Sequence, residues 1–199
     1  MTSTPLEGLP FTTLGLLAAL CLATVAHELG HLLVAARLRI PVRRITVGLG
    51  PILWRREAGA LPELVWRLAP LGMAIGVPGR RDDDGTLRRP VEHDMLVAAA
   101  GPAASFLLPV ALVGLAALLR AGPGLESWLI ATALLSALLG LSNLLPLPGL
   151  DGGHLVVLGA ARLGWVLSPR QEIQVHRVGL RLVVLATVVF LGARVAGIA

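Results

Sequence analysis

Three scarcities limit the class of protein that this sequence can encode. Charged residues make up only 15% of the 199 residues, whereas hydrophobic residues make up 55%. Soluble domains contain about 25% charged residues, so this balance indicates a membrane protein. The chain has no lysine, so its net charge of +5 rests on arginine. Its one cysteine, Cys21, lies in an apolar segment, which excludes an internal disulfide.

Long apolar segments predict a membrane α-helical fold with about four transmembrane helices. A helix that crosses a bilayer needs about 20 mostly apolar residues. Four segments meet this requirement: residues 11–36, 95–119, 127–150 and 178–199. In the last of them, Arg181 and Arg194 can extend toward the two membrane faces. We expect a single domain over residues 1–199, whose first span is retained as a helix rather than removed as a signal peptide.

The arginines predict how these spans are oriented. Most lie between the first two spans or between the third and the fourth: Arg39, Arg43, Arg44, Arg55, Arg56, Arg67, Arg80, Arg81, Arg88 and Arg89, then Arg162, Arg170 and Arg177. Cytoplasmic loops carry an excess of basic residues, so both connections are expected to face the cytoplasm. This predicts a multi-pass protein of the cell membrane with both ends outside. The clustering suits contact with a lipid bilayer better than a nucleic-acid surface.

The first connection contains a predicted β-hairpin, residues 45–77. Residues 45–54 and 64–77 are rich in Val, Ile, Leu and Trp, with Ala58-Gly59-Ala60 between them. Such a pattern is typical of two strands around a turn. Gly48, Gly50 and Gly72 allow close approach of another backbone to these strands.

The first span contains an H-E-x-x-H motif, His27-Glu28-Leu29-Gly30-His31. On a helix, residues i and i+4 share a face, so both imidazoles can reach one metal ion. Glu28 projects beside them and can act as a general base. A carboxylate inside an apolar span costs about 2.5–3.5 kcal/mol, so it needs a partner or a task. The structural alternative is that both histidines hydrogen-bond neighbouring helices while Glu28 pairs with an arginine.

A third metal ligand is expected because catalytic zinc usually takes three protein ligands. Asp151 is the best candidate, since it follows an uncharged span and precedes Gly152 and Gly153, which leave its backbone free to turn. The predicted topology places it, like His27 and His31, toward the cytoplasmic end of a span. Taken alone, Asp151 could equally occupy a turn or a helix cap.

Two motifs together resemble those of the site-2 protease family of intramembrane metalloproteases. The first is H-E-x-x-H in the first core span. The second is N-x-x-P-x-P-x-L-D-G, which matches at every named position of residues 143–152, NLLPLPGLDG. Residues 48–51, GLGP, and 70–72, PLG, are similar to the family's membrane-associated β-hairpin. Ala100-Gly101-Pro102 is similar to the start of its second core helix.

The resemblance implies an intramembrane zinc endopeptidase that cuts membrane protein substrates in or near their transmembrane segments. Regulated intramembrane proteolysis and signal-peptide clearance are both activities of the family. One zinc ion is expected per chain, in an active site toward the cytoplasmic side. The implied residues are His27, His31 and Asp151 as ligands, Glu28 as general base, Asn143 for the substrate or oxyanion, and Gly48, Gly50 and Gly72 for substrate binding.

Two residues depart from the family's pattern. Ser105 stands where many members carry asparagine, and Met73 stands where a second glycine usually follows Gly72. We expect neither residue to touch the metal ligands, and both to affect how substrate fits. With no inserted PDZ module or appended regulatory domain in view, a compact member is expected.

Three other functions remain as alternatives. A different membrane metalloprotease would draw its third ligand from a later glutamate, and only Glu172 follows Glu126. A non-catalytic relative that binds membrane segments would not need Glu28. A metal transporter would need ligands along a transmembrane path, whereas only one cluster is apparent. His154 is either a hydrogen-bond partner of the metal site or an interfacial histidine. The sequence carries no signal of oligomeric state.

Overall fold

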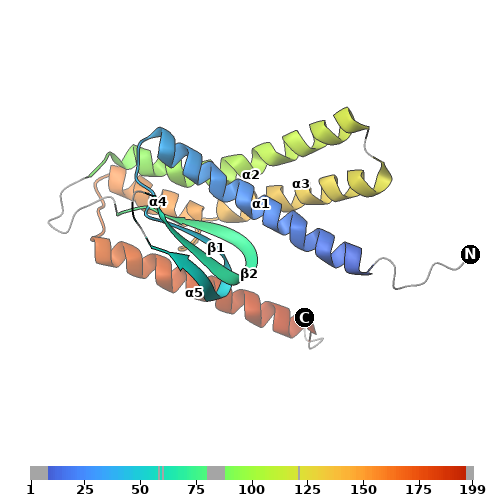
Figure 1. Cartoon of the computed structure of the whole chain (residues 1–199). Coiled ribbons are helices and arrows are strands. Elements are labelled where there is room, and N and C mark those ends of the chain that lie inside the picture. The colour runs from blue at the N-terminus through green and yellow to red at the C-terminus, as the bar shows by residue number, and fades with distance from the viewer. Residues whose placement is uncertain (1–8, 58, 60, 80–87, 121, 196–199) are drawn as a thin grey trace, which may run out of the picture. The chain divides into compact units, whose positions relative to one another are not determined.

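The computed structural model describes residues 9–57, 59, 61–79, 88–120 and 122–195. Its elements are α1 (Leu9–Arg37), β1 (Arg44–Arg56), β2 (Glu63–Gly76), α2 (Val91–Leu119), α3 (Pro123–Asn143), α4 (Asp151–Arg162) and α5 (Pro169–Val195) (Figure 1). The chain divides into two compact units. The first comprises Met1–Pro78 and Ala99–Ser142, and the second comprises Gly79–Ala98 and Asn143–Ala199.

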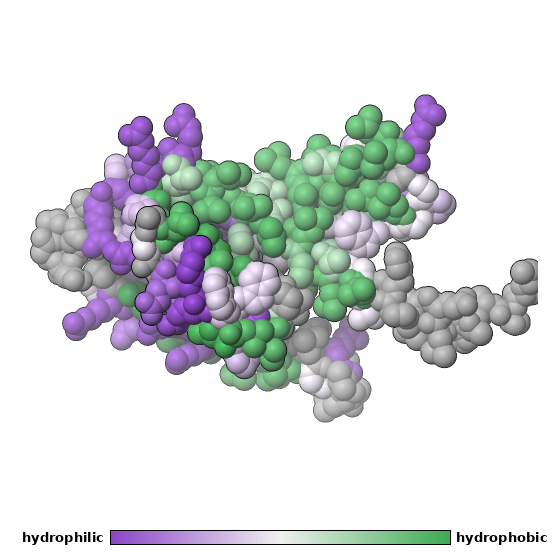
Figure 2. Space-filling view, viewed as in Figure 1, coloured by the Kyte–Doolittle hydropathy of each residue, from purple (hydrophilic) through white to green (hydrophobic). Residues whose placement is uncertain are grey.

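Three helices of the described chain are long and apolar enough to cross a membrane: Thr13–Arg37, Val91–Leu119 and Pro123–Asn143. They correspond to the first three predicted spans. Their outer faces expose large apolar side chains, such as Leu107 at 69%, Val110 at 71% and Leu118 at 80%. Figure 2 shows this hydrophobic surface over the helices. Apolar surface of this extent is typical of contact with lipid rather than water.

The fourth span, residues 178–199, stays a prediction. It falls on α5, which has 27 residues and begins at Pro169. Within the described residues, α5 is not among the helices that are both long enough and apolar enough to cross a membrane. Residues 196–199 of the predicted span lie outside the described part of the chain.

Prolines account for both ends of α3, which differ from the predicted 127–150. The helix begins at Pro123, because proline has no N–H to lose in the first turn and its φ suits a helix. It ends at Asn143, three residues before Pro146. A proline removes a backbone donor and clashes with the preceding turn, so two prolines as close as Pro146 and Pro148 strongly disfavour continuation of the helix. The last seven residues of the predicted span are therefore not helical.

Strands β1 and β2 form a small sheet whose pairing is more complex than that of the predicted hairpin. Residues 44–47 of β1 pair in parallel with residues 63–66 of β2. The same residues 44–47 also pair with residues 73–76. This second pairing is antiparallel, because it runs from Arg44 opposite Gly76 to Val47 opposite Met73. Residues 54–56 pair with 64–66 in the same antiparallel sense. Residues 73–76 therefore form one edge of the sheet and residues 54–56 the other.

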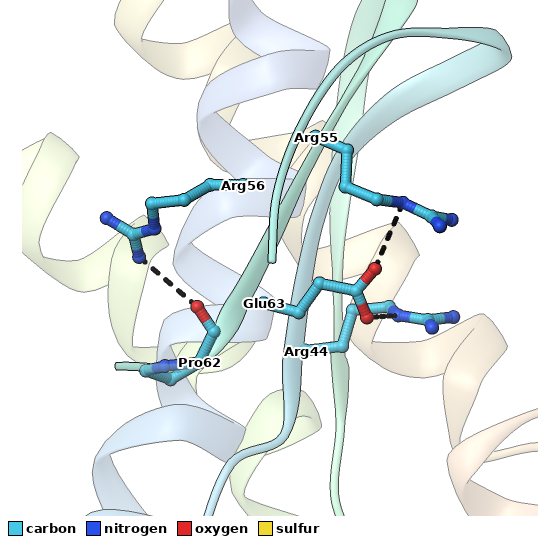
Figure 3. Close-up of polar contacts among 5 residues, drawn as sticks. All are labelled: Arg44, Arg55, Arg56, Pro62 and Glu63. Carbon is cyan, nitrogen blue, oxygen red and sulfur yellow. Dashed lines mark hydrogen bonds and ion pairs between the residues drawn. The ribbon is translucent and has the colours of Figure 1, made fainter. Parts of the chain in front are cut away.

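Glycine makes this folding back of β1 possible. Gly48 has φ 91° and Gly50 has φ 86°, a left-handed region that other residues rarely adopt. Across the strands, Glu63 pairs with Arg44 at 2.6 Å and with Arg55 at 3.1 Å (Figure 3). Both arginines are about half exposed, so these pairs stabilise the sheet only slightly.

Small residues let α1, α2 and α3 of the first unit approach closely. A Cβ added at Gly30 would overlap the carbonyl oxygen of Ala100 and lie 2.7 Å from the Cβ of Ala104. A Cβ added at Gly140 of α3 would lie 2.8 Å from the Cβ of Ser105. Lipid tails are as apolar as these helices, so the hydrophobic effect does not drive the helices together. They associate instead through close packing of their backbones at small residues.

In the second unit, two buried glycines begin α4. A Cβ at Gly152 would overlap the carbonyl oxygens of Leu144 and Leu145, and one at Gly153 would overlap that of Leu147. Neither glycine has a positive φ. The expectation that they free the backbone to turn is therefore wrong. They are required because the proline-rich segment packs directly on the first turn of α4.

Candidate active site

His27 and His31 bring their imidazoles together on the buried face of α1. The two Nε2 atoms are 3.3 Å apart, and the ring centroids are 4.9 Å apart at an interplanar angle of 82°. The residues are only 5% and 7% exposed. Their spacing of four residues puts them one helical turn apart, as the motif predicted.

The donor atoms of this pair fit a tetrahedral metal ion. Zinc binds imidazole nitrogen at about 2.0–2.1 Å, which places two ligands of a tetrahedron roughly 3.3–3.4 Å apart. The observed Nε2–Nε2 separation is 3.3 Å. A carboxylate oxygen of Glu28 completes a group whose ligand atoms all lie within 4.8 Å of one another. His27, Glu28 and His31 can therefore hold a metal ion.

Gly101 of α2 leaves room for the two imidazoles. A Cβ added there would lie 2.7 Å from Nε2 of His27 and nearer still to Nε2 of His31. Both nitrogens thus face a backbone that carries no side chain. The sequence placed Gly101 only at the start of a core helix, and its role in the site was missed.

Ser105, one turn after Gly101, contacts a predicted metal ligand directly. Its Oγ lies 2.9 Å from Nδ1 of His27, and the residue is fully buried. The expectation that Ser105 does not touch the metal ligands is therefore wrong. The spacing Gly101-x-x-x-Ser105 was the available signal, because it puts both residues on one face of α2.

The edge of the sheet holds Glu28. The backbone N–H of Ile75 donates to Oε2 of Glu28 at 3.2 Å, and α1 contacts β2 (Figure 1). Ile75 belongs to residues 73–76, the edge segment of β2. A hydrogen bond to an ionised acceptor is stronger than a neutral one, so this contact orients the carboxylate.

The remaining predicted residues lie on both units. Gly48 and Gly50 are on β1 and Gly72 is on β2, in the first unit with the histidines. Asn143 is the last residue of α3 and Asp151 is the first of α4, and both belong to the second unit. The roles of all five in the site stay predictions. A carboxylate in the first turn of a helix is also favoured by the helix dipole, so the structural alternative for Asp151 keeps its physical basis.

An H-E-x-x-H motif on a helix is the arrangement in which metalloproteases hold zinc. The model of peptidase family M50 matches residues 15–123 and 117–186 of this sequence. The chain therefore belongs to peptidase family M50.

Its relatives are named as proteases, several of them as zinc metalloproteases. The zinc metalloprotease RasP of Oceanobacillus iheyensis is 42% identical over 67 residues, 33% of this chain and 16% of RasP. The regulator of sigma-E protease RseP of Salmonella typhimurium is 34% identical over 100 residues, 46% of this chain and 22% of RseP. The chain thus matches about a fifth of the length of these relatives.

A solved structure shares the fold. The site-2 protease from Methanocaldococcus jannaschii superposes with a TM-score of 0.52, covering 90% of this chain and 67% of the other, at 21% sequence identity. At this identity the likeness concerns the fold alone. It agrees with the membrane helices and the small sheet described above.

Proposed function

We propose that this chain is an intramembrane zinc endopeptidase that hydrolyses peptide bonds in or near the transmembrane segments of membrane protein substrates. Regulated intramembrane proteolysis and signal-peptide clearance both fit such an activity. The observation that carries the proposal is the pair of buried imidazoles at tetrahedral spacing beside Glu28. A module that only binds membrane segments would need neither the spacing nor the carboxylate.

One zinc ion per chain would be held by His27, His31 and Asp151. Membership of family M50 and the buried histidine pair support this ligand set. Asp151 supplies the carboxylate that would complete three protein ligands and leave a fourth position open. The arginine distribution supports a cell-membrane protein whose active site is toward the cytoplasm.

The residues divide the chemistry between them. Zinc, when bound, supplies Lewis acidity that polarises the scissile carbonyl and lowers the pKa of water. Glu28 accepts the proton of the attacking water and transfers it to the leaving amine. The Ile75 N–H keeps the carboxylate pointing toward the site. The side-chain amide of Asn143 would donate to the oxyanion that develops on the substrate carbonyl.

Zinc content tests the ligand set. The detergent-purified wild type should hold about one zinc per chain. Loss of a residue that only hydrogen-bonds a metal ligand weakens metal binding by up to about 100-fold. Asp151→Ala removes a proposed ligand itself, so its zinc affinity should fall by at least about that factor. Metal analysis and competition with a chromophoric chelator measure both. Asp151→Asn keeps the size of the side chain and serves as a second variant in case alanine disturbs the start of α4.

Either unexpected result is informative. Unchanged zinc affinity in both Asp151 variants would show that the third ligand is another residue. A folded wild type that binds no zinc would instead favour the non-catalytic relative that binds membrane segments.

The substrate would enter as an added strand at residues 73–76. A peptide bond in a helix is shielded by its own hydrogen bonds, so the substrate must unwind before cleavage. An exposed sheet edge can bind an extended segment through backbone hydrogen bonds. The Ile75 N–H at this edge already points to Glu28, which would bring an added strand next to the general base. Gly48, Gly50 and Gly72 would keep the neighbouring backbone unobstructed.

Met73→Pro tests this entry route. Alternate residues of a strand face the same side, so the Met73 N–H shares the outer edge with that of Ile75. Proline removes this donor and is tolerated on an edge strand. We expect cleavage of a transmembrane substrate to fall at least about 10-fold, the loss of roughly one hydrogen bond to a charged or well-aligned partner, with zinc still bound.

The matched control is Met73→Ala, which changes the side chain and keeps the N–H. Because this variant keeps the edge donor, it should cleave substrate faster than Met73→Pro, and its difference from wild type measures the contribution of the half-buried side chain to substrate fit. Equal cleavage by the proline and alanine variants would rule out strand addition at this edge.

A further inference from the structure

The buried hydroxyl of Ser105 has no part in the chemistry described so far, yet it contacts a histidine of the metal group. His27 directs Nε2 toward His31 and the space at Gly101, and its other nitrogen, Nδ1, lies 2.9 Å from Oγ of Ser105. A neutral imidazole carries its proton on one nitrogen only. Nε2 therefore presents a lone pair when Nδ1 carries the proton and donates it to the neighbouring group.

We propose that Ser105 is a positioning residue for zinc binding. Its hydroxyl oxygen accepts the Nδ1–H of His27 and so keeps the lone pair on Nε2, directed to the metal. The inference rests on the proposed role of His27 as a zinc ligand. The partner of a metal-bound histidine commonly sets the tautomer and the ring orientation in this way.

Burial makes the contact selective. Ser105 is 0% exposed and His27 only 5%, so bulk water cannot easily replace the hydroxyl. In a medium of low dielectric constant, a hydrogen bond is stronger and its loss costs more than in water. The loss of this buried partner should therefore change the tautomer of the imidazole.

A neighbouring helix holds Ser105 in place. Oγ of Ser136, on α3, donates to the backbone oxygen of Ser105 at 2.9 Å, and Ser136 is also 0% exposed. Gly140 of α3 admits the Ser105 side chain, because a Cβ at Gly140 would lie 2.8 Å from that of Ser105. The chain of contacts Ser136–Ser105–His27 thus connects α3 through α2 to the metal ligand on α1.

Ser136 also provides a matched control. It is the same residue type, equally buried, and bonded to Ser105 through the backbone rather than the hydroxyl. Ser136→Ala removes a buried hydrogen bond of the same helix interface without removing the contact to Nδ1. Packing effects and tautomer effects are therefore separable.

The first measurement uses zinc-free full-length protein in detergent, at a pH where the imidazole is neutral. Nitrogen NMR of labelled histidine reports which nitrogen of His27 carries the proton. Wild type and Ser136→Ala should have Nδ1 protonated, whereas Ser105→Ala should shift His27 toward the other tautomer. Because no zinc is present, this result does not depend on whether the chain is a zinc enzyme.

The second measurement is zinc affinity by chelator competition. Ser105→Ala should weaken zinc binding about 10–100-fold, the usual effect of losing a histidine's outer partner. Ser105→Asn keeps an acceptor oxygen and should restore most of the affinity. Substitution of cobalt for zinc adds a spectroscopic signature, because a misdirected imidazole changes the visible absorption of tetrahedral cobalt.

Two results would overturn the inference. One is an unchanged His27 tautomer together with unchanged zinc affinity in Ser105→Ala. The other is an equal loss of affinity in Ser105→Ala and Ser136→Ala, which would reveal a packing effect alone. A wild type that shows the predicted tautomer but binds no zinc would contradict the proposed function, and with it the role of Ser105 toward zinc.

Discussion

Glu28→Gln is expected to reduce peptide hydrolysis by about 10³-fold, within the range for loss of a general acid–base group. Glutamine has nearly the same shape, and its carbonyl oxygen can still accept the Ile75 N–H that now contacts the carboxylate. It cannot take up a proton from water at neutral pH. Zinc should stay bound at about one per chain, because the two imidazoles remain in place. Cleavage of a reconstituted transmembrane substrate, with zinc measured on the same sample, checks both expectations.

A carboxylate outside the site provides the control. Glu92 pairs with Arg162 at 2.7 Å, and both side chains are about half exposed. Exposed pairs contribute about 0–1 kcal/mol, so Glu92→Gln should leave cleavage within about fivefold of wild type. Substantial cleavage by zinc-loaded Glu28→Gln would exclude Glu28 as the base. The carboxylate would then be a ligand or a structural group.

Gly101→Ala is expected to abolish high-affinity zinc binding. The added Cβ would lie 2.7 Å from Nε2 of His27 and overlap Nε2 of His31, so both imidazoles would have to move. Because two ligands are displaced, zinc affinity should fall by more than the roughly 100-fold that follows loss of a residue hydrogen-bonded to one ligand. This loss should also exceed that in Asp151→Ala, which removes one ligand. Chelator competition measures the affinity, and a thermal melt reports whether the helices remain packed.

Gly114 supplies the comparison on the same helix. A Cβ added at Gly114 meets nothing within 4 Å, so Gly114→Ala should bind zinc like the wild type. Alanine favours a helix over glycine by about 1 kcal/mol, so this variant should be as stable or slightly more stable. If Gly101→Ala bound zinc as tightly as Gly114→Ala, the metal would not occupy the space that the imidazoles and Gly101 define.

Local patterns were enough to predict three of the membrane helices and the histidine pair. A run of about 20 apolar residues has few structures available other than a spanning helix. Within a helix, a spacing of four residues puts His27 and His31 on one face whatever packs around them. The strands at 45–77 were likewise predicted by composition and by the glycines between and within them. These features depend on residues that are close in sequence.

The pairing of the sheet and the ends of α3 were predicted less well. Residues 44–47 pair with two separate segments of β2, and this register depends on the folding back at Gly48 and Gly50. Strand propensity does not specify such a register, since each strand can pair in several ways. The end of α3 could have been placed from Pro146 and Pro148, because two prolines this close strongly disfavour a helix there.

The sequence by itself determined that this is a helical membrane protein with one metal-binding motif, because those properties follow from hydropathy and helical periodicity. Only the tertiary structure decided what surrounds the motif. Ser105 reaches His27 across 78 positions, and Ile75 reaches Glu28 across 47. Contacts over such separations depend on how closely α1, α2 and the sheet pack, and Gly30 and Gly101 set that distance by lacking side chains. Helical spacing puts Gly101 and Ser105 on one face of α2, but no local pattern says which element that face meets, because the atoms that meet belong to different elements.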